Sequence, residues 1–385
     1  MREDWDIRLF KDVFDLQMGK TPDRKNFSLF EGDNTWVSIK DLDGKYISSS
    51  KECISDEAAK NIKLVKRGTV IMSFKLTVGK TAIAGKDLYT NEAIMAFNLR
   101  NGYDIDASFL YYYLMNYRWE GSNKAVMGIT LNKATISKHK IAIPPKSTQL
   151  SIVSELDKLN ELIRIKKEQL KDYDTLAQSI FYEMFGDPVE NEKGWEVKDL
   201  IETVIPECKI SYGIVQPGEH VEDGVPIVRP VDMLQTFISK DGLKKTTKEI
   251  SNSYNRTILT GKELLICVRG TTGVVSLVDE SLKGANVTRG IAPLLFSMDV
   301  ERWFMYYQIK TPSVRGVISS LTRGIALKQI NMSDLRKIQV ILPPLSLQQS
   351  FAQKIEQIEQ QKAAIQKTIT DLETLLAARM QYWFD

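Results

Sequence analysis

The chain has 385 residues, of which 43% are apolar and 26% are charged, a length and composition typical of a folded protein with two or three domains. No stretch approaches the ~18 uncharged residues of a membrane span. Cys53, Cys208 and Cys267 stand too far apart in the sequence to predict a disulfide framework or a thiolate metal site. We therefore expect a cytoplasmic protein, whose net charge of +3 says little about its partners.

The first segment, residues 1–146, is predicted to be a globular domain. It opens with a strand-like stretch at Trp5, and a Gly turn leads into an apolar strand over residues 67–74. A polar, glycine-bearing loop follows that strand. The Pro-Pro pair at 144–145 ends the domain.

Residues 147–190 are predicted to form a long spacer helix. Their apolar residues alternate in steps of four and three once Lys166 is counted, a heptad pattern typical of a coiled coil. At ~1.5 Å per residue, a helix of about 35 to 38 residues within this segment would be about 55 Å long, too long to pack on one small domain. The predicted seam, meaning the stripe that faces a partner helix, consists of Ile152, Leu156, Leu159, Ile163, Leu170, Tyr173 and Ile180.

Residues 191–345 are predicted to be a second globular domain that repeats the first in degenerate form. The same landmarks recur in the same order, at a separation that grows from about 190 to 199 residues. The matched segments are residues 5–8 with 195–198, 36–41 with 227–232, 67–74 with 260–268, 109–112 with 304–307, 128–131 with 324–327, and Pro-Pro 144–145 with 343–344.

Residues 346–385 are predicted to form a second spacer helix in the same phase, with Lys362 and Arg379 as polar interruptions. Matching length, phase and position after Pro-Pro favour pairing of the two helices with each other. Ordinary long surface helices are the alternative. The predicted seam of this helix consists of Phe351, Ile355, Ile358, Ile365, Ile369, Leu372 and Leu376.

Charge alternates along these four segments. Consecutive blocks that end at residues 146, 193, 345 and 385 carry net charges of +5, −4, +3 and −1. Two basic domains between mildly acidic helices weakly favour a nucleic-acid partner. The predicted fold class is mixed α/β (α+β): two pseudo-repeated domains, each a small irregular sheet with short helices, separated by two long antiparallel coiled-coil helices with approximate two-fold symmetry.

The order of domain, Pro-Pro pair and helix, repeated twice, resembles the type I restriction-modification specificity subunits over essentially the whole chain. Several local strings also look like that family, and they are specific when taken together. These strings are residues 9–14, 19–22, 149–150, 185–187, 210–218, 224–229, 348–349 and 383–385.

The resemblance implies a non-catalytic protein. Each domain would be a target recognition domain that reads one half of a bipartite double-stranded DNA target, while the helices set the spacing and dock two methyltransferase subunits. Methylation and cleavage would belong to the methyltransferase and restriction subunits, which would also bind S-adenosylmethionine, ATP and Mg²⁺; this chain would bind no cofactor. Because the two domains have diverged outside their landmarks, we expect two unlike half-sites.

Candidate DNA-contacting residues of the second domain lie in polar loops that leave strands. Arginine forks onto guanine, whereas Lys, Ser and Thr hold phosphates. The strongest segment is residues 269–273, where two glycines permit close backbone approach; a plain hairpin turn is the alternative. The set for this domain is Lys209, Tyr212, Arg229, Arg269, Thr271, Thr272, Arg289, Arg323 and Lys328, with solvated surface as the alternative for each.

Lysines dominate the corresponding set in the first domain. Because a lysine ammonium favours phosphates or a single acceptor, we expect this domain to depend more on Asn, Ser and Thr, or on DNA shape, for its discrimination. The set is Lys40, Ser73, Lys75, Thr77, Lys80, Asn91, Lys124 and Lys133.

Enzymatic alternatives lack required residues. Gly-Lys-Thr strings at 19–21 and 79–81 end like a phosphate-binding loop, but Phe14 and Phe74 occupy the position of its first glycine. The Pro-Pro pairs lack the flanking residues of an adenine methyltransferase, and two histidines make no metal cluster or triad. The leading alternative is a non-enzymatic scaffold whose domains bind protein and whose coiled coil dimerises.

Overall fold

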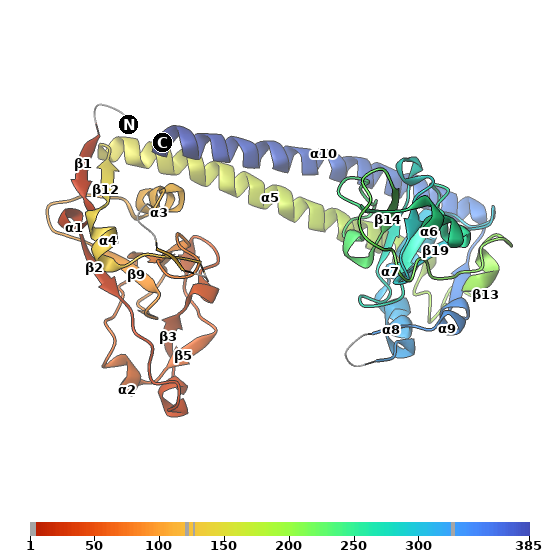
Figure 1. Cartoon of the computed structure of the whole chain (residues 1–385), viewed down its shortest axis with the longest axis horizontal. Helices are drawn as coiled ribbons and strands as arrows, with labels where there is room; N and C mark the ends of the chain where they lie inside the picture. The colour runs from red at the N-terminus through yellow and green to blue at the C-terminus, as the bar shows by residue number, and fades with distance from the viewer. Residues whose placement is uncertain (1–4, 120–122, 126–127, 325–327) are drawn as a thin grey trace. The chain divides into compact units, whose positions relative to one another are not determined.

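The computed structural model describes residues 5–119, 123–125, 128–324 and 328–385 (Figure 1). The chain divides into two compact units, Met1–Lys167 with Lys367–Asp385, and Glu168–Gln366. Each unit therefore contains one globular domain together with part of both long helices, α5 (Lys146–Phe185) and α10 (Leu345–Phe384).

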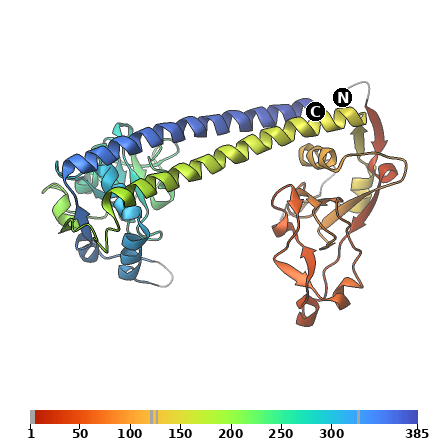
Figure 2. The ribbon, with the colours of Figure 1, turned by 180° about the vertical axis from the view of Figure 1, so that it is seen from behind.

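In the first unit, the ends of the first domain are held together by a strand pair at the base of α5. Strand β1 (Asp6–Leu9) runs antiparallel to β12 (Lys140–Ile143), and Figures 1 and 2 show the two side by side. Because β12 directly precedes Pro144 and Pro145, this pair anchors the start of the long helix to the domain.

Two sheets form the body of the first domain. The larger sheet has the strand order β2 (Phe14–Met18), β9 (Ile94–Leu99), β6 (Val70–Ser73), β7 (Thr81–Ala84), β4 (Tyr46–Ile47), and the smaller β5 (Glu52–Ile54), β3 (Asn34–Val37), β8 (Tyr89–Thr90). The other elements are α1 (Phe10–Val13), α2 (Asp56–Ala59), α3 (Ala107–Asn116), α4 (Lys133–Lys138) and the hairpin of β10 (Asn123–Ala125) and β11 (Gly128–Thr130).

The second domain follows the same plan in its own unit. Strand β13 (Glu196–Asp199) pairs with β20 (Gln339–Leu342) at the base of α10. Its two sheets are β17 (Val275–Leu277), β16 (Leu264–Cys267), β19 (Ile291–Leu294), and β15 (Lys244–Thr246), β14 (Val225–Val228), β18 (Asn286–Val287). The helices are α6 (Lys248–Ser253), α7 (Arg302–Lys310), α8 (Pro312–Leu321) and α9 (Met332–Arg336).

The predicted repeat is confirmed by topology, because strand pairs recur with the same orientation in both domains. The parallel pair of β3 with β8 returns as β14 with β18, and the antiparallel hairpin of β6 and β7 returns as β16 and β17. One match needs correction. The backbone N–H groups of Leu131 and Ile330 make the same hydrogen bond, to Phe74 and Val268, so Leu131 corresponds to Ile330 and not to Leu327, which lies outside the described residues.

The long helices run antiparallel to one another within each unit. In the first unit Glu155 contacts Arg379, and Lys167 contacts Glu373 at 2.7 Å. In the second unit Asp174 contacts Lys362 at 2.8 Å, and Phe181 packs against Phe351. In both cases a later residue of α5 meets an earlier residue of α10, as the predicted antiparallel coiled coil requires.

Burial along the helices follows the predicted seam only in part. Eight seam residues are buried, whereas Leu170, Tyr173, Ile180, Ile365, Leu372 and Leu376 are half-buried. Phe181 and Phe185, which heptad counting did not select, are fully buried beside Phe304 of α7. This end of α5 packs on the second domain as well as on α10, so its buried stripe is wider than a coiled-coil seam. The eight buried seam residues are Ile152, Leu156, Leu159, Ile163, Phe351, Ile355, Ile358 and Ile369.

A buried glutamine ties each long helix to its domain. The side-chain oxygen of Gln149 accepts a hydrogen bond from Asp106 N–H, and its amide donates to Asp104 and Pro144 carbonyls. Gln348 makes the same three bonds, with Glu301 N–H and the carbonyls of Asp299 and Pro343. Buried polar groups need such partners, so these two glutamines fix how each helix leaves its domain.

Candidate nucleic-acid interface

The turn between β16 and β17 has a backbone conformation that favours glycine at two positions. Gly270 and Gly273 lie at φ of 84° and 81°, a region that residues with a Cβ rarely adopt. The N–H of Gly273 donates to Cys267 O at 2.8 Å, and the N–H of Gly270 donates to Lys328 O at 2.8 Å. The turn is thereby joined to the segment before α9, and Arg269 lies at the junction.

Three of the predicted DNA-contacting residues line one cleft of about 400 Å³ in the second domain. Tyr212, Arg269 and Arg289 come from three separate segments of the chain, and Ile330 and Val268 supply buried apolar surface. The remaining lining residues are Val215, Gln329, Asn331 and Met332.

The two arginines of this cleft are electrostatically unsatisfied. Neither the Arg269 nor the Arg289 guanidinium has an ion pair or a hydrogen bond to any residue of the described ranges. Arg229, by contrast, is paired with Asp232 at 2.9 Å, which holds the Arg229 pKa above its ordinary value, and Arg323 contacts Asp334 at 3.5 Å. The cleft therefore offers two unpaired cations next to apolar and aromatic surface.

The other predicted residues of the second domain do not line the cleft, and some of them make hydrogen bonds within the domain. The ammonium of Lys209 donates to Pro206 O at 2.7 Å. Thr272 accepts a hydrogen bond from the Thr322 hydroxyl at 3.1 Å. Thr271 and Lys328 are exposed. The structure thus brings three of the nine predicted residues into one site and leaves Arg229, Lys209 and Thr272 in local contacts.

In the first domain the loop after β6 has the same backbone path. Leu76 and Gly79 lie at φ of 62° and 92°, and Gly79 N–H donates to Ser73 O at 3.0 Å, as Gly273 does to Cys267. Ser73 itself is fully buried. Its hydroxyl donates to Thr77 O and accepts from Lys80 N–H. Ser73, one of the predicted DNA contacts, thus has its side chain buried and hydrogen-bonded within its own loop.

The remaining predicted residues of the first domain are spread over five segments. Lys75 is half-buried over the Phe74 ring, and Asn91 is half-buried with its side-chain oxygen accepting from Ala93 N–H at 3.0 Å. Lys124 lies in β10, but its side chain is outside the described residues. The exposed members of the set are Lys40, Thr77, Lys80 and Lys133.

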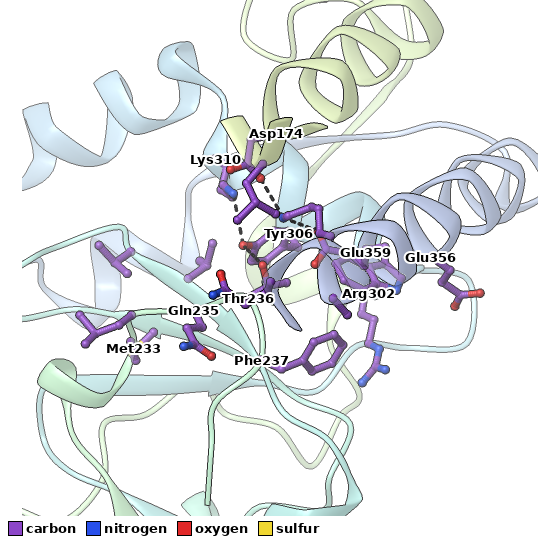
Figure 3. Close-up of a pocket in the computed structure, with 18 of the residues that line it drawn as sticks. Asp174, Met233, Gln235, Thr236, Phe237, Arg302, Tyr306, Lys310, Glu356 and Glu359 are labelled. Carbon is purple, nitrogen blue, oxygen red and sulfur yellow. Dashed lines mark hydrogen bonds and ion pairs between the residues drawn. The ribbon is translucent and has the colours of Figure 1, made fainter. Parts of the chain in front are cut away.

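A larger pocket of about 850 Å³ lies in the second unit, away from every predicted DNA contact (Figure 3). Lys310 donates to the Tyr306 hydroxyl at 3.2 Å at one edge. Lys362 binds both Asp174 and Glu359, at 2.8 and 2.7 Å. Burial lowers the pKa of Lys362, but hydrogen bonds to the two carboxylates outweigh it and raise the pKa overall. This polar interruption of the seam is thus a paired cation.

The described ranges hold no group of three or more His, Cys, Asp or Glu side chains arranged to bind a metal ion. They also hold no helix long and apolar enough to cross a membrane.

Two diverged copies of one α+β domain, each followed by a long helix of an antiparallel pair, define a class of two-domain recognition proteins. Residues 2–172 and 194–374 each match the family model of the type I restriction modification DNA specificity domain. The chain therefore belongs to this family, the non-catalytic DNA-recognition component of type I restriction-modification systems.

Relatives and solved structures agree with this assignment. The type I restriction enzyme MjaIX specificity subunit of Methanocaldococcus jannaschii is 24% identical over 418 residues, spanning 97% of this chain and 91% of that protein. The EcoBI specificity subunit of Escherichia coli is 22% identical over 265 residues, 63% of this chain and 56% of that one.

Two solved chains share the fold. One, from a structure of a type I R-M system, has a TM-score of 0.62 at 18% identity and covers 100% of this chain and 98% of its own. The S subunit from M. genitalium has a TM-score of 0.55 at 15% identity, with 99% and 96% covered.

Proposed function

We propose that each domain reads one half of an asymmetric bipartite DNA target. The observation that carries this proposal is the cleft of Tyr212, Arg269 and Arg289, where two arginines without protein partners lie beside apolar surface. Unpaired guanidinium groups are suited to fork onto guanine or to hold phosphates. Because the corresponding loop of the first domain carries Lys75 and no arginine, the two half-sites differ.

The proposed DNA contacts are the predicted sets without Ser73. In the second domain Arg269, Arg289 and Tyr212 form the centre, and Arg323, Lys328 and Thr271 flank it. In the first domain the contacts come from the loop after β6 and from its neighbours. The full proposed sets are Lys40, Lys75, Thr77, Lys80, Asn91, Lys124 and Lys133, and Lys209, Tyr212, Arg229, Arg269, Thr271, Thr272, Arg289, Arg323 and Lys328.

The long helices, in this proposal, set the distance between half-sites and dock two methyltransferase subunits. Each helix is 40 residues long, and leucines outside the seam are about half exposed, as a partner surface requires. These are Leu150, Leu162, Leu176 and Leu375, at 49%, 45%, 47% and 46% exposure. The methyltransferase subunits, with restriction subunits joining through the complex, would modify or cleave cytoplasmic DNA with S-adenosylmethionine, ATP and Mg²⁺ of their own.

Selection of bound duplexes from a random DNA pool tests this function. The full chain is used alone and together with the methyltransferase subunit encoded beside it, at one fixed, moderate salt concentration, because phosphate contacts make affinity depend on salt. The expected result is an enriched motif of two unlike blocks at constant spacing.

Two other results would contradict parts of the proposal. If folded protein enriches no motif in either preparation, the proposal of DNA recognition is wrong, and a scaffold whose domains bind protein becomes the better explanation of the repeat. A motif with two identical blocks would retain DNA recognition but contradict the proposed asymmetry.

A further inference from the structure

The residues around the cleft of the second domain have counterparts in the first domain. The same backbone hydrogen bonds recur at both places, and they define which residue of one domain corresponds to which residue of the other. The paired bonds are Lys20 N–H to Thr90 O with Ile214 N–H to Val287 O, Asn91 N–H to Val37 O with Thr288 N–H to Val228 O, and Phe74 N–H to Ala93 O with Val268 N–H to Gly290 O.

This register assigns counterparts in the first domain to both arginines of the cleft, to Tyr212 and to Val215. Lys75 stands where Arg269 stands, one residue after Phe74 and Val268. Glu92 stands where Arg289 stands, one residue after Asn91 and Thr288. By the first of the paired bonds, Met18 matches Tyr212 and Thr21 matches Val215.

The two matched positions differ in whether the two domains carry the same charge there. Position 75/269 is cationic in both domains, as expected for a contact that both domains make alike, such as a DNA phosphate. Position 92/289 reverses its charge, from a carboxylate in the first domain to a guanidinium in the second. Both side chains at this position are exposed.

Glu92 is held in a defined place. Thr21 Oγ1 donates a hydrogen bond to its carboxylate, and the backbone next to it is fixed by the bond from Ile94 N–H to Asn91 O at 3.2 Å. A carboxylate on a DNA-binding surface is repelled by phosphates, so it is tolerated best where a base amino group donates to it.

We propose that Arg289 and Glu92 are matched specificity-determining residues: Arg289 reads a guanine in the half-site of the second domain, and Glu92 accepts a hydrogen bond from a cytosine amino group in the half-site of the first. This inference rests on the proposed function. An arginine fork matches guanine O6 and N7, and a carboxylate matches the cytosine N4 donor. The charge reversal at one matched position is thus a source of the difference between the two half-sites.

The experiment repeats the duplex selection with the full chain and its methyltransferase subunit. The variants are Arg289→Lys, Arg289→Ala and Glu92→Gln. Arg256→Ala and Glu57→Gln serve as controls, because these residues are exposed on the same two domains and are not among the matched residues. A good base contact gives roughly 5- to 150-fold discrimination.

The expected result is a loss of that discrimination at a single guanine of one block for both Arg289 variants, and at a single cytosine of the other block for Glu92→Gln. Arg289→Lys keeps the charge but not the fork, so affinity should fall less than with alanine while the base preference still disappears. Both controls should keep the whole motif.

The duplex selection gives different results if the proposed function is wrong and if only the matched reading residues are wrong. No motif for the unchanged protein would overturn the proposed function. A motif that survives the Arg289 and Glu92 variants, or that weakens equally at all positions, would overturn the matched reading residues and leave bipartite recognition in place. A change in only one block would overturn the role of the other residue.

Discussion

Single polar side chains decide how each domain is joined to its long helix. Gln149 and Gln348 are buried and make matching sets of three hydrogen bonds. Tyr113 and Gln308 occupy a second matched position, where the Tyr113 hydroxyl accepts from Ala142 N–H and the Gln308 carbonyl oxygen accepts from Ile341 N–H. The role is the same although the residue has changed, because what the strand requires is an acceptor for its N–H group.

Replacing Gln348 by alanine should destabilise the second unit. The change leaves Glu301 N–H and two carbonyl groups without partners in a buried place, which costs roughly 1–3 kcal/mol. Gln349→Ala is the matched control, since Gln349 is exposed on the next position of the same helix and should cost under about 0.5 kcal/mol. Urea denaturation of both variants measures the difference, and equal midpoints would contradict the role given to Gln348.

The Glu155–Arg379 pair gives the first unit a pH-dependent contribution to its stability. Hydrogen bonds from Arg379 hold the pKa of Glu155 below its ordinary value of 4.5 despite partial burial. A lowered folded-state pKa stabilises the fold above the unfolded pKa, and this contribution is lost as pH falls through the folded pKa.

Glu155→Gln should therefore lower the unfolding free energy near neutral pH, by no more than about 1 kcal/mol because the pair is only partly buried. The gap to the unchanged protein should close in acid, below the ordinary glutamate pKa of 4.5. Denaturation curves over this range check it, with Glu183→Gln on an exposed position of the same helix as control. A gap independent of pH would rule out the ion pair as its cause.

At the scale of elements, each long helix has two kinds of apolar residue. Leu156 is fully buried in the first unit, whereas Leu162 on the same helix is 45% exposed. The heptad pattern separates them, because Leu156 falls on the predicted seam and Leu162 does not. The second kind is what the proposed docking of a methyltransferase subunit would use.

The substitutions Leu156→Ala and Leu162→Ala form a matched pair that tests this division. Leu156→Ala should destabilise the first unit by about 2–5 kcal/mol through the cavity it leaves, whereas Leu162→Ala should leave stability nearly unchanged. In a pull-down with the methyltransferase subunit, Leu162→Ala should weaken association. Full association together with unchanged stability would place Leu162 outside the partner surface.

For the whole molecule, the repeat implies that the domains are interchangeable readers. Exchange of residues 191–345 for the second domain of another family member should change one block of the selected DNA motif and leave the other block and the spacing unchanged. The reason is that the exchanged segment lies between the end of α5 and the start of α10, so both long helices keep their length. Sequencing of the enriched duplexes checks it. A change in both blocks would show that the domains do not read independently.

The sequence alone was sufficient for the plan of the molecule. Heptad spacing, the repeated landmarks and the Pro-Pro pairs predict two related domains and two long helices, because burial on one face of a helix imposes a period that can be counted. The matching glutamines could also have been found, since both stand four residues after a Pro-Pro pair. The family resemblance rested on the same features.

Only the tertiary structure decided which polar residues are free to act. Arg229 and Arg289 look alike in the sequence, yet one is neutralised by Asp232 and the other lines a cleft. Ser73 was predicted to face DNA and is buried, and Glu92 was not selected although it matches Arg289. Arg229 and Ser73 are engaged by residues a few positions away, through local backbone conformations that hydrophobic periodicity does not report. The cleft and the match of Glu92 with Arg289 depend instead on hydrogen bonds between segments far apart in the chain.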